Sequence, residues 1–259
     1  MVNIMTMNGI DVSHWQSTLN LASINCDFVI IKVTEGMTVI DPMADTFFKQ
    51  ASKLGKKIGF YHFAHPENNS AAKEAKFFYK QAKQMFGHGI PILDWESIGR
   101  ANIKWAKEWL DEIYRLTGVK PLIYMSESVV NNHNWKEVAE ADYGLWVAKY
   151  RDTAIHYNYD MTDAGKKPVV KHWSVIAMWQ WTAQGKLTGY SGTLDCDVFY
   201  GNPETWDKYA GIQSVTEIAK EVIDGKWGNG LIRTIRLKLA GYDYQAIRNK
   251  VNELLRKKK

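Results

Sequence analysis

The sequence has few of the residues that build disulfide frameworks or metal centres. Its 259 residues include only two cysteines, Cys26 and Cys196, which are too few for a disulfide framework or a cysteine-based zinc site. We expect two small buried thiols instead. The seven histidines are scattered and form no H-E-x-x-H signature. The sequence therefore gives no reason to expect a metal or any other cofactor.

Long apolar runs are missing as well. No stretch is long enough to span a bilayer. Residues 1–9 lack the basic and apolar regions of a signal peptide. We therefore expect a protein without a membrane span that is made in the cytoplasm of its host. Any task outside the cytoplasm would then depend on delivery by another component.

Aromatic residues and an uneven charge distribution are present instead. Eleven Trp and thirteen Tyr offer flat apolar surfaces with polar tips, which suit the faces and edges of sugars as well as a protein core. From Ser214 to the end, eleven Lys or Arg stand against five Asp or Glu, whereas the rest of the chain is close to neutral. This basic tail favours an anionic partner such as a cell wall, a membrane surface or a nucleic acid. The nucleic acid ranks last, because no nucleic-acid-binding motif accompanies the charge.

Short apolar runs alternate with helical patterns through the first part of the chain. Helical spacing of apolar residues predicts helices over residues 44–54, 71–85 and 103–116. Strands buried on both faces read as continuous apolar runs, and such runs predict eight strands: 9–12, 28–33, 57–63, 92–95, 121–125, 145–148, 177–181 and 194–199. Strands alternating with helices indicate an irregular parallel (β/α) barrel of about eight strands with incomplete helices. We assign this barrel to residues 1–210.

A second unit is expected over residues 214–257, as a small three-helix module. Residues 214–217 form a capping box that opens a helix with Ile218, Val222 and Ile223. Three glycines in residues 225–230 interrupt it. A second helix follows through Ile232, Ile235 and Leu239 and stops at Gly241. Asp243 caps a third helix, in which Tyr244, Ile247, Val251 and Leu254 line one face.

Acidic residues at the strand ends are the sharpest chemical signal. Asp94 and Glu96 lie two apart at the end of the fourth predicted strand, so their side chains point to the same face. Asp11 ends the first strand and Asp195 lies in the last, and those two strands are neighbours in a closed barrel. Clustered carboxylates raise one another's pKa, which provides the protonated acid beside an ionised one that glycosidic cleavage needs.

The groups around these acids leave two interpretations open. Asp11, Asp94, Glu96 and Asp195, with His14 nearby, could bind a divalent cation, although we do not favour a metal. A sugar cleft is favoured by the aromatic, amide and charged residues at or near other strand ends. We predict that six of them bind substrate: Tyr61, Tyr124, Lys32, Glu35, Trp146 and Gln180.

Motifs in the first 210 residues resemble glycoside hydrolase family 25, the Chalaropsis-type lysozymes common among phage endolysins. They run in family order: GIDVSHWQ at 9–16, IIKVTEG at 30–36, GFYHF at 59–63, LDWE at 93–96, LIY at 122–124, LWVA at 145–148, WQ at 179–180 and LD at 194–195. The resemblance implies hydrolysis, with retention and without a metal, of the β-1,4 bond between N-acetylmuramic acid and N-acetylglucosamine. The glycan strands of bacterial peptidoglycan would be the substrate. Together with the missing signal peptide, it favours phage lysis, with release through a holin-type pore.

The resemblance also assigns roles. By position, Glu96 matches the general acid and Asp94 the second carboxylate. Asp11 and Asp195 complete the acidic floor, and Tyr61 and Tyr124 match tyrosines that contact sugar. Residues two apart on a strand have Cα atoms about 6.6 Å apart, which does not readily give the ~5–5.5 Å carboxyl separation of a direct nucleophile. We therefore favour assistance by Asp94 to the acetamido group of the substrate.

The tail resembles the CW-seven type of cell-wall-binding repeat that follows some phage lysozymes. The matching elements are 222–230, Arg233, 240–244 and 251–252. The resemblance implies binding of the muropeptide, and we assign four binding residues: Trp227, Asn229, Arg233 and Tyr242. A single copy argues against strong avidity. A helical cap that completes the barrel is the alternative for this segment.

Two other functions fit parts of the sequence. A chitinase-like barrel also ends its fourth strand with Asp-x-Glu, but it carries further acids upstream, where this chain has only residues 89–92, GIPI. A non-catalytic wall-binding protein would not need the acidic set. Chitin oligomers without muramic acid, and the variant Glu96→Gln, distinguish these alternatives from a muramidase.

Overall fold

The computed structural model describes residues 5–239, 242 and 244–257 of the chain. It divides into two compact units, Met1–Gly211 and Ile212–Lys259, which are considered separately below. Within the described residues, no helix is sufficiently long and apolar to cross a membrane. Both cysteines are free thiols, with Cys196 buried and Cys26 half-buried.

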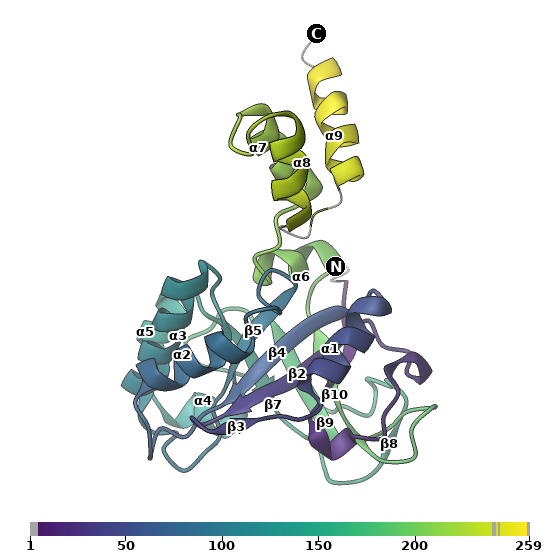
Figure 1. The fold of residues 1–259 in the computed structure, drawn as a ribbon. Coiled ribbons are helices and arrows are strands. Elements are labelled where there is room, and N and C mark those ends of the chain that lie inside the picture. Colours follow the sequence, from purple (N-terminus) through teal and green to yellow (C-terminus); the bar gives the residue numbers. More distant parts are fainter. Residues whose placement is uncertain (1–4, 240–241, 243, 258–259) are drawn as a thin grey trace. The chain divides into compact units, whose positions relative to one another are not determined.

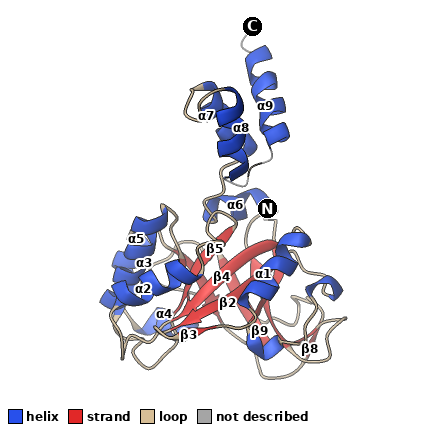
Figure 2. Cartoon of the chain, viewed as in Figure 1, coloured by secondary structure: helices blue, strands red, loops and turns tan. Residues whose placement is uncertain are grey.

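The first unit is a closed barrel of eight strands (Figures 1 and 2), as the apolar runs predicted. The order around the barrel is β1-β10-β9-β7-β6-β5-β4-β2, and β2 pairs back with β1. The bounds are β1 Met7–Val12, β2 Phe28–Glu35, β4 Lys57–Phe63, β5 Gly89–Asp94, β6 Leu122–Ser126, β7 Gly144–Ala148, β9 Met178–Lys186 and β10 Leu194–Phe199. Two short strands, β3 (Val39–Ile40) and β8 (His156–Tyr157), pair with β2 and β9.

Helices cover the barrel unevenly, which confirms the expectation of incomplete helices. The early strands are followed by α1 (Ala44–Lys53), α2 (Ala71–Gln81) and α3 (Ile103–Thr117). Figure 1 shows α2, α3 and α5 (Lys136–Glu140) on one side of the barrel. The remaining α-helices in the described part of this unit are α4 (Glu127–Asn132) and α6 (Pro203–Tyr209), and two short 3-10 helices, His14–Gln16 and Leu21–Ser23, follow β1. The connection from β7 to β9 contains the short strand β8 and no helix.

Helix α2 is shorter than its apolar spacing indicated. It ends at Gln81, whereas the pattern predicted a helix to Met85. Met85 is nevertheless buried, because the chain turns back over the core and Phe86 makes a bridge with Gly89 at the start of β5. A buried turn thus continued the apolar pattern beyond the true end of the helix.

Strand β10 runs antiparallel to both of its neighbours, β1 and β9, so the barrel is not parallel throughout. The connection from β9 to β10 is only residues 187–193, which is too short for the crossover that a parallel pair requires. As a result, the first residues of β10 lie at the barrel end where the other strands finish. This reversal determines where Asp195 is placed.

The described residues of the second unit form three helices, α7 (Val215–Ile223), α8 (Gly230–Leu239) and α9 (Tyr244–Arg256). The predicted capping box is present, with Ser214 and Glu217 each bonding the other's backbone N–H. The core of the unit consists of Ile218, Val222, Leu237 and Ile247.

The predicted face of the second helix differs from the observed one. Ile232 and Ile235 are exposed, at 58% and 48%, while Leu237 is fully buried. Apolar residues occur around much of this short helix, so its sequence pattern did not identify the packed face. The predicted helix stop at Gly241 and the cap at Asp243 lie outside the described residues.

Candidate active site

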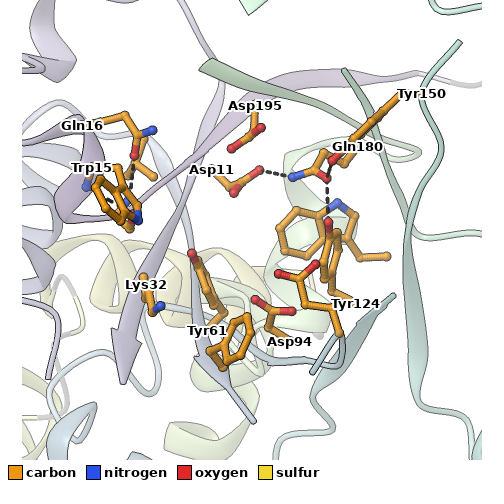
Figure 3. Close-up of a pocket in the computed structure, with 15 residues that line it drawn as sticks. Asp11, Trp15, Gln16, Lys32, Tyr61, Asp94, Tyr124, Tyr150, Gln180 and Asp195 are labelled. Carbon is orange, nitrogen blue, oxygen red and sulfur yellow. Dashed lines mark hydrogen bonds between the residues drawn. The ribbon is translucent and has the colours of Figure 1, made fainter. Parts of the chain in front are cut away.

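Four acidic residues line one pocket, and they come from β1, from the end of β5 and from β10. The pocket has a volume of about 300 Å³ (Figure 3). Its acidic residues are Asp11, Asp94, Glu96 and Asp195, the four singled out in the sequence. The other lining residues are Val12, Ser13, Trp15, Gln16, Lys32, Tyr61, Phe63, Tyr124, Trp146, Tyr150 and Gln180.

Strand register brings Asp11 and Asp195 together. Asp11, near the end of β1, is directly opposite Asp195, near the start of the antiparallel β10. Figure 3 shows the two carboxyl groups side by side. The reversed direction of β10 is therefore what places an acid from the beginning of a strand among acids from the ends of strands.

Asp94 and Glu96 reach the pocket from the end of β5 and from the residues that follow it. Between them, Trp95 is fully buried and packs against Trp105 and Trp135, with ring centroids 5.4 and 6.4 Å apart. Asp94 is the last residue of β5 and is buried, and its Oδ1 has no hydrogen-bond partner among the described residues. Glu96 is exposed at the pocket mouth. One carboxyl is thus enclosed, and the next remains accessible.

Burial raises the pKa of all four acids, and repulsion from neighbouring carboxylates adds to the shift of Asp11, Asp94 and Asp195. Burial, followed by the charge of Glu96, raises the pKa of Asp94 well above its ordinary value. Burial and Asp195 do the same to the pKa of Asp11. The pKa of Asp195 is raised to about 6 by burial and by Glu96. Burial also raises the pKa of Glu96, although Lys32 opposes the shift. The pocket can therefore hold protons at a pH where free carboxyls are ionised.

Burial of the Asp195 charge and its repulsion by Glu96 have a cost in stability, which Asp195→Asn should reveal. The pKa of Asp195 is raised from 3.8 to about 6, so the folded state holds its proton more tightly than the unfolded state. The cost of ionising Asp195 in the folded state is therefore absent below about pH 4, grows as the pH rises from about 4 to 6, and is complete above about pH 6. We expect the variant to increase the free energy of unfolding near neutral pH by up to about 3 kcal/mol, since each pKa unit corresponds to about 1.36 kcal/mol.

Urea unfolding near neutral pH and below about pH 4 measures this gain. The matched control is Asp142→Asn. The side chain of Asp142 is 92% exposed, and its φ of 63° is one that asparagine tolerates. The control is expected to change stability by less than about 0.5 kcal/mol at either pH. An equal gain for Asp195→Asn at both pH values would contradict the electrostatic explanation.

Lys32 is held at the pocket by an ion-pair network. Its Nζ lies 2.6 Å from Oε2 of Glu35, and Oε1 of Glu35 lies 2.9 Å from Nε2 of His65. His65 Nδ1 lies 2.6 Å from Glu67. Burial lowers the pKa of His65, but hydrogen bonds to Glu35 and Glu67 outweigh burial and raise it overall. Glu35 is not in the pocket lining, so its contact with the site is through Lys32.

Gln180 connects the acids to the aromatic wall. Its Nε2 donates to Oδ2 of Asp11 at 2.6 Å, and its Oε1 accepts from the hydroxyls of Tyr124 at 2.7 Å and Tyr150 at 2.5 Å. The rings of Tyr124 and Trp146 are 4.4 Å apart. Figure 3 shows the three hydrogen bonds around this amide. One side chain thereby fixes both an acid and two rings.

The sequence analysis did not assign several residues of this site. Trp15 is 79% exposed at the pocket, on the short helix His14–Gln16, and its ring lies 4.7 Å from that of His14. Tyr150 stands on the opposite side of the pocket (Figure 3). Trp15 lies within the motif GIDVSHWQ at residues 9–16, which could have pointed to it. Tyr150 lies just beyond β7, where the same strand-end argument could have found it.

The four residues assigned to wall binding contact one another in pairs within the second unit. Trp227 packs edge-on against Tyr242 at 5.7 Å, and its Nε1 donates to Glu221 at 3.0 Å. Arg233 donates to Oδ1 of Asn229 at 2.8 Å. Trp227 and Tyr242 are partly buried on the core of the unit, so they contribute to its stability as well.

The arrangement of potential metal ligands bears on the divalent-cation site that the sequence left open. Across the residues that the structure describes, no group of three or more His, Cys, Asp or Glu side chains is arranged to hold a metal ion. A closed barrel with clustered acids of raised pKa in a polar, aromatic pocket is the arrangement of a glycoside hydrolase.

The chain belongs to glycosyl hydrolases family 25. The model of that family matches residues 10–190, and the CW_7 repeat matches residues 216–255. The lysozyme of Streptococcus phage Cp-7 is 28% identical over 237 residues, which are 87% of this chain and 62% of that lysozyme. The N,O-diacetylmuramidase of Chalaropsis sp. is 31% identical over 142 residues, 48% of this chain and 67% of the enzyme.

A solved structure supports the same fold. The bacterial lysozyme from Streptomyces coelicolor superposes with a TM-score of 0.66 at 25% identity, covering 78% of this chain and 96% of that structure. The family therefore identifies the chain as a glycoside hydrolase of the lysozyme class. Neither the chitinase-like nor the non-catalytic alternative is favoured by these relatives.

Proposed function

We propose that this protein is an endolysin-type muramidase that hydrolyses the β-1,4 bond between N-acetylmuramic acid and N-acetylglucosamine in bacterial peptidoglycan. The observation that carries the proposal is the pairing of an accessible acid, Glu96, with an enclosed acid, Asp94, in a pocket that raises the pKa of both. This pair provides the proton donor and the second carboxylate that a retaining glycosidase needs.

In the proposed mechanism, Glu96 protonates the glycosidic oxygen as the bond from that oxygen to the anomeric carbon breaks. Asp94 orients the acetamido N–H of the substrate and stabilises its developing positive charge, while the acetamido oxygen attacks the anomeric carbon. Water then opens the cyclic intermediate, with Glu96 accepting its proton, and the configuration is retained. Asp11 and Asp195 supply the negative field beneath the ring.

The other lining residues position the sugars. Tyr61, Tyr124 and Trp146 offer rings and hydroxyls to the glycan, and Gln180 and Lys32 offer donors. Glu35 contributes by holding Lys32 in place. Each of these groups lies at or beside the pocket, and their mixture of flat apolar faces and polar tips suits a pyranose.

The second unit, by its CW_7 match, is proposed to bind the muropeptide of the wall through Trp227, Asn229, Arg233 and Tyr242. We expect this binding to increase the local concentration of the barrel at its substrate.

Digestion of purified peptidoglycan, followed by mass spectrometry of the reducing ends, tests the proposed bond. A muramidase leaves N-acetylmuramic acid at the new reducing end. New ends carrying N-acetylglucosamine, cleavage of chitin oligomers at a comparable rate, or the absence of new reducing ends would contradict the proposal.

Trp15 is expected to stack on a sugar at the rim of the pocket. Its 79% exposure is unusual for a tryptophan, and its position on the lining gives the ring a binding role. We expect Trp15→Ala to raise KM roughly tenfold, equivalent to about 1.4 kcal/mol, with little change in kcat. The control is Tyr157→Ala, since Tyr157 is 64% exposed and outside the pocket lining. Unchanged KM for Trp15→Ala would show that the ring does not contact substrate.

A further inference from the structure

Strand β10 carries a second carboxyl group, Asp197, which has no role in the mechanism above. Asp197 follows Asp195 by two residues, so both side chains leave the strand on the same side. Asp195 lines the pocket, whereas Asp197 does not and is 0% exposed. A group that is sealed in this way cannot touch the substrate. Its effect on the reaction must pass through a neighbouring residue.

The two oxygens of Asp197 have different surroundings. Oδ1 accepts a hydrogen bond of 2.9 Å from Nε1 of Trp146. Oδ2 is buried and finds no donor among the described residues. An ionised carboxylate would leave this oxygen charged and unsolvated in the barrel interior, which is strongly unfavourable. A protonated Oδ2 would instead need only an acceptor.

Asp11 is the acceptor within reach. Asp11 is paired in register with Asp195, and Asp197 is paired with Gln180, so the four side chains occupy adjoining positions on three neighbouring strands. The carboxyls of Asp11 and Asp197 are also close enough for each to shift the pKa of the other. Two carboxyls in such a contact share one proton, because they cannot both be ionised at close range.

The remaining groups around Asp197 favour the neutral form as well. Burial, followed by the charges of Asp11 and Asp195, raises the pKa of Asp197 well above its ordinary value. The other titratable groups that sense its charge are Tyr150, Tyr159 and Cys196, which are neutral in their ordinary state. Asp11 lines the open pocket and already accepts from Gln180, so within the pair it is the better place for the negative charge.

We propose that Asp197 is a permanently protonated carboxylic acid that donates a hydrogen bond from Oδ2 to Asp11, and that this bond positions Asp11 in the acidic floor. Asp197 is thus a positioning residue. Together with Gln180, it presents two donors to Asp11 and fixes the orientation of that carboxylate. The first half of the proposal concerns a protonation state alone, whereas the second half rests on the proposed muramidase function.

Infrared difference spectroscopy of the full chain tests the protonation state without reference to activity. The spectrum of Asp197→Asn is subtracted from that of the wild type near neutral pH. We expect the difference to contain one carbonyl stretch of a protonated carboxyl group. Loss of a carboxylate stretch instead would overturn the proposal. Asp142→Asn, which removes an exposed carboxylate, shows the signal of a single ionised residue for comparison.

Kinetics of two variants test the positioning role. The amide of Asp197→Asn can donate to Asp11 and accept from Trp146, so we expect kcat and its pH profile to stay close to those of the wild type. Asp197→Leu has a similar volume and no donor, and we expect kcat to fall about tenfold or more, with an altered pH profile.

A large loss of kcat in a folded Asp197→Asn protein would show that the charge of Asp197 is needed, and would overturn the proposal. If Asp197→Leu does not fold, the kinetics of Asp197→Asn and the infrared result still test the proposal. Should the wild type itself cleave no peptidoglycan, the proposed function fails, but the infrared result on Asp197 remains valid.

Discussion

Glu96→Gln is expected to reduce kcat on peptidoglycan by a factor of about 10²–10⁴, the usual contribution of a general acid. Glutamine keeps the size of the side chain and has no proton of suitable acidity to donate to the leaving oxygen. Because Glu96 is exposed at the pocket mouth, the fold should be unaffected and KM should change little. Release of reducing ends, measured with substrate in excess, gives the loss.

The pH profile gives an independent check on Glu96. Its pKa is raised, so the protonated form that donates to the substrate persists to higher pH than for a free carboxyl, and activity is lost as the pH rises through that pKa. The matched control is Glu108→Gln on α3, whose side chain is 57% exposed and outside the pocket. Full activity of Glu96→Gln would assign the proton to another group, or the protein to a non-catalytic role.

Asp94→Asn has the second large expected effect, a fall in kcat on the order of 10²–10³. The variant keeps the shape of a side chain that is almost completely enclosed but removes the charge that we propose stabilises the cyclic intermediate. The loss should appear in kcat rather than in KM, because the charge develops only as the bond breaks. A melting curve of the variant controls for folding. It should show no loss of stability near neutral pH, since burial and Glu96 disfavour the ionised form of Asp94.

The same residue distinguishes acetamido assistance from direct nucleophilic attack. With assistance, an activated glycoside incubated with the Glu96→Gln protein leaves no sugar attached to the enzyme. With direct attack, mass spectrometry finds a glycosyl adduct on Asp94. Such an adduct would refute the mechanism favoured here, while leaving the identity of the cleaved bond unaffected.

Eight strands and four acids could be predicted because their signals are local. A strand enclosed on both faces is apolar along its length, as in β5, where all six residues are buried. An acid directly after such a run contrasts sharply with it, and Asp94 and Glu96 were found in this way. Closure of the barrel then places Asp11 beside the last strand.

The features that were missed depend on contacts between distant residues. The direction of β10 follows from a short connection that has no strong pattern of its own. In the sequence, Asp197 has the same kind of position as Asp195. Only the structure shows that Asp195 lines the pocket and that Asp197 is fully buried outside it. On α8, the sequence pattern predicted Ile232 and Ile235 as core residues, but both are exposed and Leu237 is buried. Periodicity identifies a helix but does not select a face when apolar residues surround it.

The position of β10 also determines when the enzyme becomes competent during synthesis. This strand inserts between β1 and β9, and it supplies Asp195 and Asp197. A nascent chain that ends at β9 carries Asp11, Asp94 and Glu96, yet its barrel is open and two strand edges are unpaired. Such a fragment has an incomplete acidic floor and is prone to pair with other chains. We therefore expect that the ribosome must translate nearly all of the barrel before a molecule can cut a glycan, and that prematurely terminated products are inactive.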